Sequence, residues 1–163
     1  MTTTTTTDGT TTIEAVADLP MIRMRREFAA SPAQLVRAHT DADLFARWMG
    51  PDGSSLTVDQ WDARTGGSYR YVSTFGSDEY AFRGCFHTVR EDRIVWTFTF
   101  EEMPDAVCLE TFMFEDLGNG RTLLRADSLY DSFEARDLML SSMEPGVNDS
   151  YAHLDTMLAA GEL

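Results

Sequence analysis

The sequence contains no lysine, and its 13 basic residues, all of them arginine, are outnumbered by 27 acidic residues. The formal net charge is therefore −14. Acidity on this scale repels phosphate backbones and anionic lipid head groups. We expect neither nucleic acid nor a membrane surface as a partner, and we interpret most of the acidic side chains as solvated surface.

Long apolar runs and a cysteine framework are also missing. No run approaches the ~20 apolar residues that cross a bilayer, so nothing predicts membrane insertion. The first residues lack the basic region and apolar core of a signal peptide. The two cysteines, Cys85 and Cys108, fall on separate expected strands, and we interpret them as free thiols. These features together favour a cytoplasmic protein.

Motifs for chemistry are scarce as well. The three histidines, His39, His87 and His153, lie in distant segments, and neither HxxxH nor CxxC occurs. We therefore expect no metal ion. There is no Gly-x-Ser-x-Gly nucleophile turn, and no glycine-rich loop carries the lysine of a phosphate site. The sequence predicts no cofactor and no motif-borne catalytic residue, which leaves acid–base chemistry by an isolated carboxyl group.

Residues 1–20 open with threonine repeats that have no apolar period, which predicts a disordered tail. Residues 21–163 are expected to form one domain. A strand over 22–28 precedes two short helices, one that begins at Ser31 and one that begins at Asp41 or Asp43. From Leu56 to Tyr130, six alternating segments separated by turns predict an antiparallel meander.

The last expected element is an amphipathic helix over residues 143–160. Its apolar residues recur in steps of three and four, Pro145 suits a first turn, and Gly161 suits the end. A helix with a broad apolar face needs a broad partner, and the meander supplies one. The predicted fold class is α+β: a helix-grip fold, in which a seven-stranded antiparallel sheet wraps around the long C-terminal helix, with two short helices after the first strand.

Three separated stretches, Ala38–Gly53, Asp62–Tyr71 and Ser128–Leu158, carry a family resemblance. Together they resemble the START-like (SRPBCC, Bet v 1-like) superfamily, and more narrowly bacterial proteins named for the C-terminal domain of the activator of Hsp90 ATPase. The resemblance implies a helix-grip fold with an elongated apolar cavity. It implies no single activity, because relatives bind lipids, polyketides or other hydrophobic molecules and some are cyclases. One position departs from the pattern: Thr88 stands two residues after Phe86, where relatives often carry an acidic residue.

Alternation places aromatic side chains on the inner face of the sheet, towards the C-terminal helix. They could line a ligand cavity or fill a solid core, and the family geometry favours a partly open cavity of at least ~300 Å³. The candidate ligand-binding residues are Trp48, Tyr69, Tyr71, Phe82, Phe86, Trp96, Phe98, Phe112, Met143, Val147 and Tyr151.

Two acidic strand residues, Glu110 and Asp127, have an ambiguous facing. We expect both on the solvated face, paired with Arg83 or Arg125. The alternative is an inward carboxyl group beside Tyr71 or Tyr151, where burial would raise its pKa and make it a candidate general acid.

Three functions fit these observations. The first is non-catalytic binding of a hydrophobic small molecule or lipid in the cavity. The second is an enzyme of the polyketide cyclase or dehydratase type, which needs two polar groups that converge inside the cavity. The third is a cochaperone-like interaction module, for which the sequence offers no obvious apolar docking patch. The sequence leaves a homodimer open.

Overall fold

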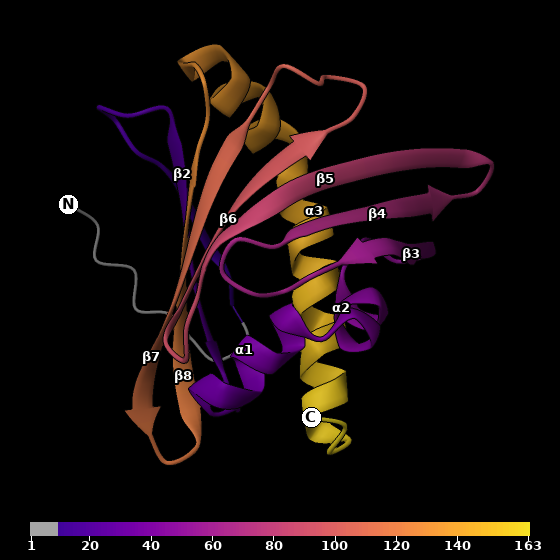
Figure 1. Cartoon of the computed structure of the whole chain (residues 1–163). Helices are drawn as coiled ribbons and strands as arrows, with labels where there is room; N and C mark the ends of the chain where they lie inside the picture. The colour runs from indigo at the N-terminus through magenta and orange to yellow at the C-terminus, as the bar shows by residue number, and fades with distance from the viewer. Residues whose placement is uncertain (1–9) are drawn as a thin grey trace.

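A computed structural model describes residues 10–163, so the first nine residues of the predicted tail lie outside the described part. The chain forms one eight-stranded antiparallel sheet in the order β1-β2-β8-β7-β6-β5-β4-β3, with a long helix across its concave side (Figure 1). The strands are β1 (Thr12–Ala15), β2 (Met21–Phe28), β3 (Ser54–Trp61), β4 (Ser68–Phe75), β5 (Asp78–Val89), β6 (Arg93–Phe100), β7 (Cys108–Gly118) and β8 (Arg121–Leu129).

The helix-grip prediction is confirmed, but the sheet has eight strands rather than seven. The additional strand, β1, lies inside the stretch that the sequence assigns to a disordered tail. It pairs with β2, Thr12 opposite Arg25 and Ala15 opposite Ile22, and Ile13 packs against the core. The threonine-rich composition hides this strand, although β-branched residues favour extended backbone once an edge is available. The two short helices accordingly follow β2.

Both short helices begin at the expected residues. Helix α1 (Pro32–Thr40) starts after Ser31, whose side chain accepts the Gln34 amide while Gln34 reciprocates, a complete capping box. Helix α2 (Ala42–Trp48) follows after Asp41, whose carboxylate accepts two first-turn amides. The two helices close one end of the grip and bring Leu44, Phe45 and Trp48 into the core.

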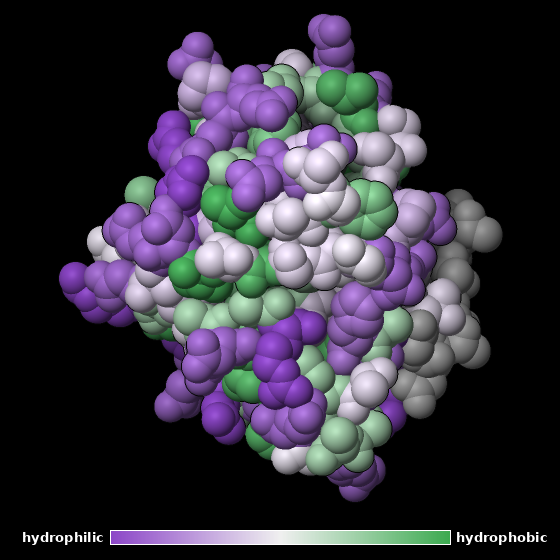
Figure 2. All heavy atoms as spheres, turned by 90° about the vertical axis from the view of Figure 1, so that its right-hand side faces the viewer, coloured by the Kyte–Doolittle hydropathy of each residue, from purple (hydrophilic) through white to green (hydrophobic). Residues whose placement is uncertain are grey.

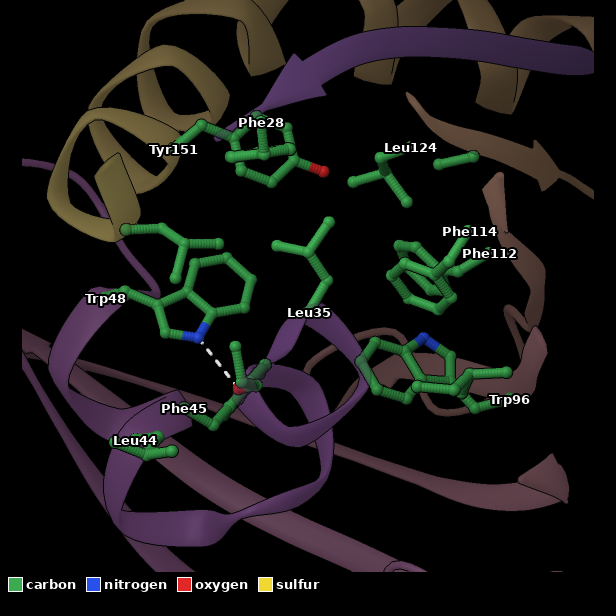
Figure 3. Close-up of a cluster of buried hydrophobic side chains, with 14 of the residues drawn as sticks. Phe28, Leu35, Leu44, Phe45, Trp48, Trp96, Phe112, Phe114, Leu124 and Tyr151 are labelled. Carbon is green, nitrogen blue, oxygen red and sulfur yellow. Dashed lines mark hydrogen bonds between the residues drawn. The ribbon is translucent and has the colours of Figure 1, made fainter. Parts of the chain in front are cut away.

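The inward-facing assignment of the aromatic residues on the sheet is confirmed. Tyr69, Tyr71, Phe86, Trp96, Phe112 and Phe114 are all buried. Figure 3 shows Phe112, Phe114 and Trp96 from the sheet approaching Trp48 and Phe45 from α2, with Tyr151 of the long helix on the opposite side. Edge-to-face contacts connect these rings; Trp96 and Phe112, for example, lie 4.9 Å apart between centroids.

The long helix, α3 (Phe133–Ala159), begins at Phe133 and not at Met143. Ser132 caps it through the Ala135 amide, so Pro145 lies inside the helix instead of in its first turn. Sequence periodicity missed the first ten residues because most of them are exposed and carry no apolar stripe. Within residues 10–163, no helix combines the length and apolarity that a membrane span requires.

Candidate functional site

A cavity of about 290 Å³ lies between the inner face of the sheet and α3. Its wall is contributed by His39 of α1, by the end of α2 and the residues after it, by inward residues of the strands from β2 to β7, and by the middle of α3. Nine of the eleven candidate residues lie on this wall: Trp48, Tyr71, Phe82, Trp96, Phe98, Phe112, Met143, Val147 and Tyr151. Their role in holding a ligand stays a prediction.

The cavity has a buried end and an open end. Trp48 and Trp96 are almost completely buried at the inner end, whereas Leu56 and Met143 are partly exposed and Pro51 is exposed. The opening therefore lies between α3 and the loop that leads into β3. On the side of the molecule seen in Figure 2, hydrophobic residues interrupt the hydrophilic surface near the middle of the face.

The two remaining candidates, Tyr69 and Phe86, lie in the core behind the wall and do not border the cavity. Their rings are 5.3 Å apart, and the Tyr69 hydroxyl donates to the Thr97 carbonyl at 2.6 Å. Alternation alone could not separate them from Tyr71 and Trp96, because all four share the inner face. The cavity follows only part of that face.

Glu110 also faces the cavity, so the expectation that it lies on the solvated face is wrong. Along β7, Glu110 alternates in phase with Cys108, Phe112 and Phe114, which are buried. Its neighbours in register are Trp96 on β6 and Ser128 on β8. The Trp96 indole N–H donates to one carboxyl oxygen at 2.5 Å, and the Ser128 hydroxyl donates to the other at 3.1 Å.

Burial dominates the electrostatics of Glu110. It raises the pKa of the carboxyl group above its ordinary value, and the hydrogen bonds from Trp96 and Ser128 oppose the rise. The hydroxyls of Tyr71 and Tyr151 respond to the same site: burial raises the pKa of both, and the nearby Glu110 carboxyl raises them further. Among the described residues, neither hydroxyl has a hydrogen-bond partner. Three polar groups thus converge in an apolar cavity.

His39 is the second polar residue that the sequence did not assign to the site. It lies on the cavity wall, is 1% exposed, and is enclosed by Trp48, Phe112 and Phe114. Its Nδ1 lies 2.7 Å from the Leu35 carbonyl oxygen, which can only accept, so the proton resides on Nδ1. Nε2 is therefore a bare lone pair, and it has no partner among residues 10–163. Burial lowers the pKa of His39 to about 4.

Asp127 and His153 lie outside the cavity. Asp127 is on the outer face, as expected, but its partner is Arg23, whose Nε donates at 2.8 Å, and not Arg83 or Arg125. His153 is a partly exposed residue of α3 that faces the loop between α2 and β3. Its Nε2 lies 2.6 Å from a carboxylate oxygen of Asp52 in that loop. Over residues 10–163, no three histidine, cysteine or acidic side chains gather as a metal site would require.

Both missed residues had a readable signal. Glu110 lies two residues from the inward Phe112, so the strand period alone places it inside; the preference for exposed carboxylates outweighed that period. His39 follows Leu35 by four residues and therefore shares the buried face of α1. Neither signal could show that the space in front of these side chains is open, since that depends on how far α3 lies from the sheet.

Comparison with known proteins supports the fold. The sequence profile described as Activator of Hsp90 ATPase homolog 1-like protein matches residues 29–159. No curated protein matches the chain. A solved structure from Rhodobacter sphaeroides is 27% identical, with 93% of this chain and 99% of that protein covered and a TM-score of 0.83.

Two further solved structures are less similar in sequence and show the fold alone. A Mycobacterium smegmatis protein is 22% identical, with 90% and 95% of the two chains covered and a TM-score of 0.81. A protein of the dynemicin biosynthetic locus is also 22% identical, with a TM-score of 0.66; the match covers 87% of this chain and 48% of that one.

Proposed function

Because the chain belongs to the Activator of Hsp90 ATPase homolog 1-like protein family, whose fold is compatible with ligand binding, we propose that it binds a hydrophobic small molecule or lipid without transforming it. The observation that carries this proposal is the cavity itself. Its volume of about 290 Å³ lies just below the ~300–1,000 Å³ typical of ligand sites, so the proposed ligand is small. Its wall is predominantly aromatic and aliphatic, which suits an apolar body.

A matched pair of tryptophan variants on α3 tests the proposal. Val147 lies on the cavity wall, whereas Leu138 is 67% exposed and does not border the cavity. We expect V147W to fill the cavity and to lose both co-purified ligand, measured by native mass spectrometry, and binding of an apolar fluorescent probe. L138W should retain both. A folded V147W variant that binds the probe as well as the unaltered protein does would contradict the proposal.

The cyclase-like alternative is supported by one specific arrangement, the convergence of Glu110, Tyr71 and Tyr151 in the cavity. A carboxyl group with a raised pKa is the kind of group that donates a proton near neutral pH. The fold shared with the dynemicin-locus protein is compatible with this role. Glu110→Gln separates the two functions: an enzyme would keep its affinity for substrate and lose turnover, whereas a carrier shows no turnover with either residue.

The cochaperone-like alternative stays a prediction. Exposed apolar side chains are available at the start of α3, where Phe133, Leu138 and Met139 are exposed by 47%, 67% and 37%. They provide contact area for a partner but do not specify one. A pull-down with the unaltered protein and with Leu138→Glu would test this surface separately from the cavity.

A further inference from the structure

The hydrogen-bond donors and acceptors of the cavity wall differ in how far the protein itself provides their partners. Its three ring N–H donors are all engaged within the protein: Trp48 Nε1 donates to the Ala38 carbonyl at 2.8 Å, His39 Nδ1 to Leu35, and Trp96 Nε1 to Glu110. Each of these bonds has good length, and none is available to a guest without breaking a buried pair. A guest therefore meets few N–H groups that could bind an acceptor.

In contrast, the cavity wall has hydrogen-bond acceptors whose lone pairs the protein does not fully use. Each Glu110 oxygen accepts one hydrogen bond, while a carboxylate has about four lone-pair sites. The Nε2 lone pair of His39 also has no partner among the described residues, but this atom is fully buried, so a guest does not reach it and Glu110 supplies the accessible acceptor. A donor on a guest can therefore bind a carboxyl oxygen of Glu110 without displacing a hydrogen bond of the protein.

The charge of the cavity wall also disfavours an anionic guest. Glu110 is the acidic residue that lines the cavity, and no arginine lines it. Arg26 packs over the Phe28 ring and lies 5.6 Å from the ring centroid of Tyr151, a residue of the cavity wall, but it pairs with Asp155 at 2.6 Å and does not itself border the cavity. A net charge of −14 adds long-range repulsion of anions.

Tyr71 and Tyr151 have neutral hydroxyls that could donate to an anion, but they lie within the field of Glu110. Burial raises the pKa of both hydroxyls, Glu110 raises both further, and Arg26 partly opposes the rise at Tyr151. An ionised Glu110 would repel a carboxylate guest in the same space, and such a guest would lose its hydration whichever form Glu110 takes. The hydroxyls therefore do not make the cavity an anion site.

From these contacts we infer that the cavity selects an apolar guest that carries a hydroxyl or amine donor, directed at Glu110, and that it rejects carboxylates and phosphates. The inference rests on the proposed binding function and narrows the class of ligand. A hydroxyl would exchange hydrogen bonds with a protonated Glu110. An ammonium group would pair with the ionised carboxylate among aromatic faces, which themselves attract cations.

Four probes with the same bicyclic skeleton test the inference: naphthalene, naphthol, naphthylmethylamine and naphthoate. Titration of the full chain by calorimetry or tryptophan fluorescence gives their relative affinities. We expect naphthol or naphthylmethylamine to bind roughly tenfold more tightly than naphthalene, and naphthoate to bind most weakly, because one charge-assisted hydrogen bond contributes about that factor. The tighter of the two donors identifies whether the bound Glu110 is protonated or ionised.

The other outcomes separate the two proposals. If naphthalene binds and neither donor probe binds more tightly, cavity binding stands and the donor inference is overturned. If naphthoate matches naphthol, the inference is likewise overturned. If no probe binds, the proposed function fails and the inference fails with it.

Variants extend the test without reliance on a single substitution. Glu110→Gln keeps the side-chain shape and removes the charge, so it should weaken naphthylmethylamine roughly tenfold and leave naphthalene unchanged. Asp127→Asn, on the outer face, is the matched control and should alter no probe. An unchanged amine affinity in a folded Glu110→Gln protein would remove Glu110 as the recognition group.

Discussion

The indole of Trp96 donates its N–H to the carboxyl group of Glu110, directly across the β6–β7 pair, at 2.5 Å. This single contact fixes an acidic side chain on the inner face of the sheet, where aromatic residues surround it. It satisfies one carboxyl oxygen and leaves the group dependent on a buried, apolar environment. The pH behaviour of the protein follows from that position.

Replacement of Glu110 by glutamine should stabilise the protein at alkaline pH. The folded-state pKa is raised above the ordinary value of 4.5, so the favourable contribution of the protonated carboxyl is complete below pH 4.5 and is lost as the pH rises through the folded pKa. The glutamine carbonyl can still accept from Trp96 and carries no charge. Urea unfolding at pH 5 and pH 8 should show a larger gain for Glu110→Gln at pH 8. A loss of stability at both pH values would contradict this account.

The contribution of His39 to stability should change with pH in the opposite direction: it is lost as the pH falls. Its folded-state pKa of about 4 lies below the ordinary 6.5, so its contribution is complete above pH 6.5 and is lost as the pH falls towards 4. A difference of this size corresponds to ~3 kcal/mol at the acid end. In a Glu110→Gln background, which removes the opposing carboxyl, His39→Gln should flatten the stability profile between pH 4 and 6.5. A profile of unchanged slope would exclude His39 as its cause.

The Arg26–Asp155 ion pair should contribute more to stability than the exposed Arg47–Glu162 pair, which joins α2 to the residues after α3. The Arg26 side chain is 5% exposed and Asp155 accepts two of its N–H groups, at 2.6 and 3.0 Å. Asp155→Asn leaves a buried guanidinium without its counter-charge; we expect a cost of ~1–3 kcal/mol, since Asp155 itself is partly exposed. The control is Glu162→Gln, which breaks the exposed pair with Arg47 and should cost less than ~1 kcal/mol. Equal losses in chemical denaturation would contradict the difference in burial.

Two glycines should respond to alanine in opposite directions. At Gly84 in β5, an added Cβ would lie 1.9 Å from the Thr97 carbonyl oxygen and 2.7 Å from the Tyr69 hydroxyl, so the β5–β6 pair must separate. We expect Gly84→Ala to cost more than ~2 kcal/mol, in the range of overpacked cores. Gly146 lies inside α3 with no atom within 4 Å of the new Cβ. Gly146→Ala should therefore gain ~0.5–1 kcal/mol from helix propensity. Thermal unfolding of the two variants gives both signs at once.

The helices and strands could be predicted from the sequence wherever the spacing of apolar residues agreed with the residues that begin or end an element. The caps at Ser31 and Asp41, and the alternation through Tyr71 and Trp96, predict elements that the structure confirms. The prediction failed where packing overrides composition: the edge strand around Ile13, which follows a threonine-rich stretch, forms because β2 offers a partner, and α3 extends back to Phe133 because Ser132 caps it.

The site was less predictable than the fold. Inward facing is a local property, so nine wall residues could be named from alternation and helical spacing. The distance between the sheet and α3 depends on the summed volume of all side chains between them. The summed side-chain volume therefore determines that Trp96 borders open space, whereas Tyr69, two strands away on the same face, does not.

Helix α3 is bonded to the rest of the domain on both sides of Pro145, and Ser150 and Asp149 accept further hydrogen bonds from the Gly50 and Asp52 amides. Near its start, the Arg136 guanidinium donates to the Val16 carbonyl at 2.8 Å; near its end, Asp155 is tied to Arg26. Pro145, which lacks an amide hydrogen for the helical ladder, lies in the same part of α3 as the residues that line the cavity. If the protein binds a ligand as proposed, local bending of α3 at Pro145 would admit it while the contacts of Arg136 and Asp155 stay in place, so we expect ligand residence time and unfolding free energy to vary independently.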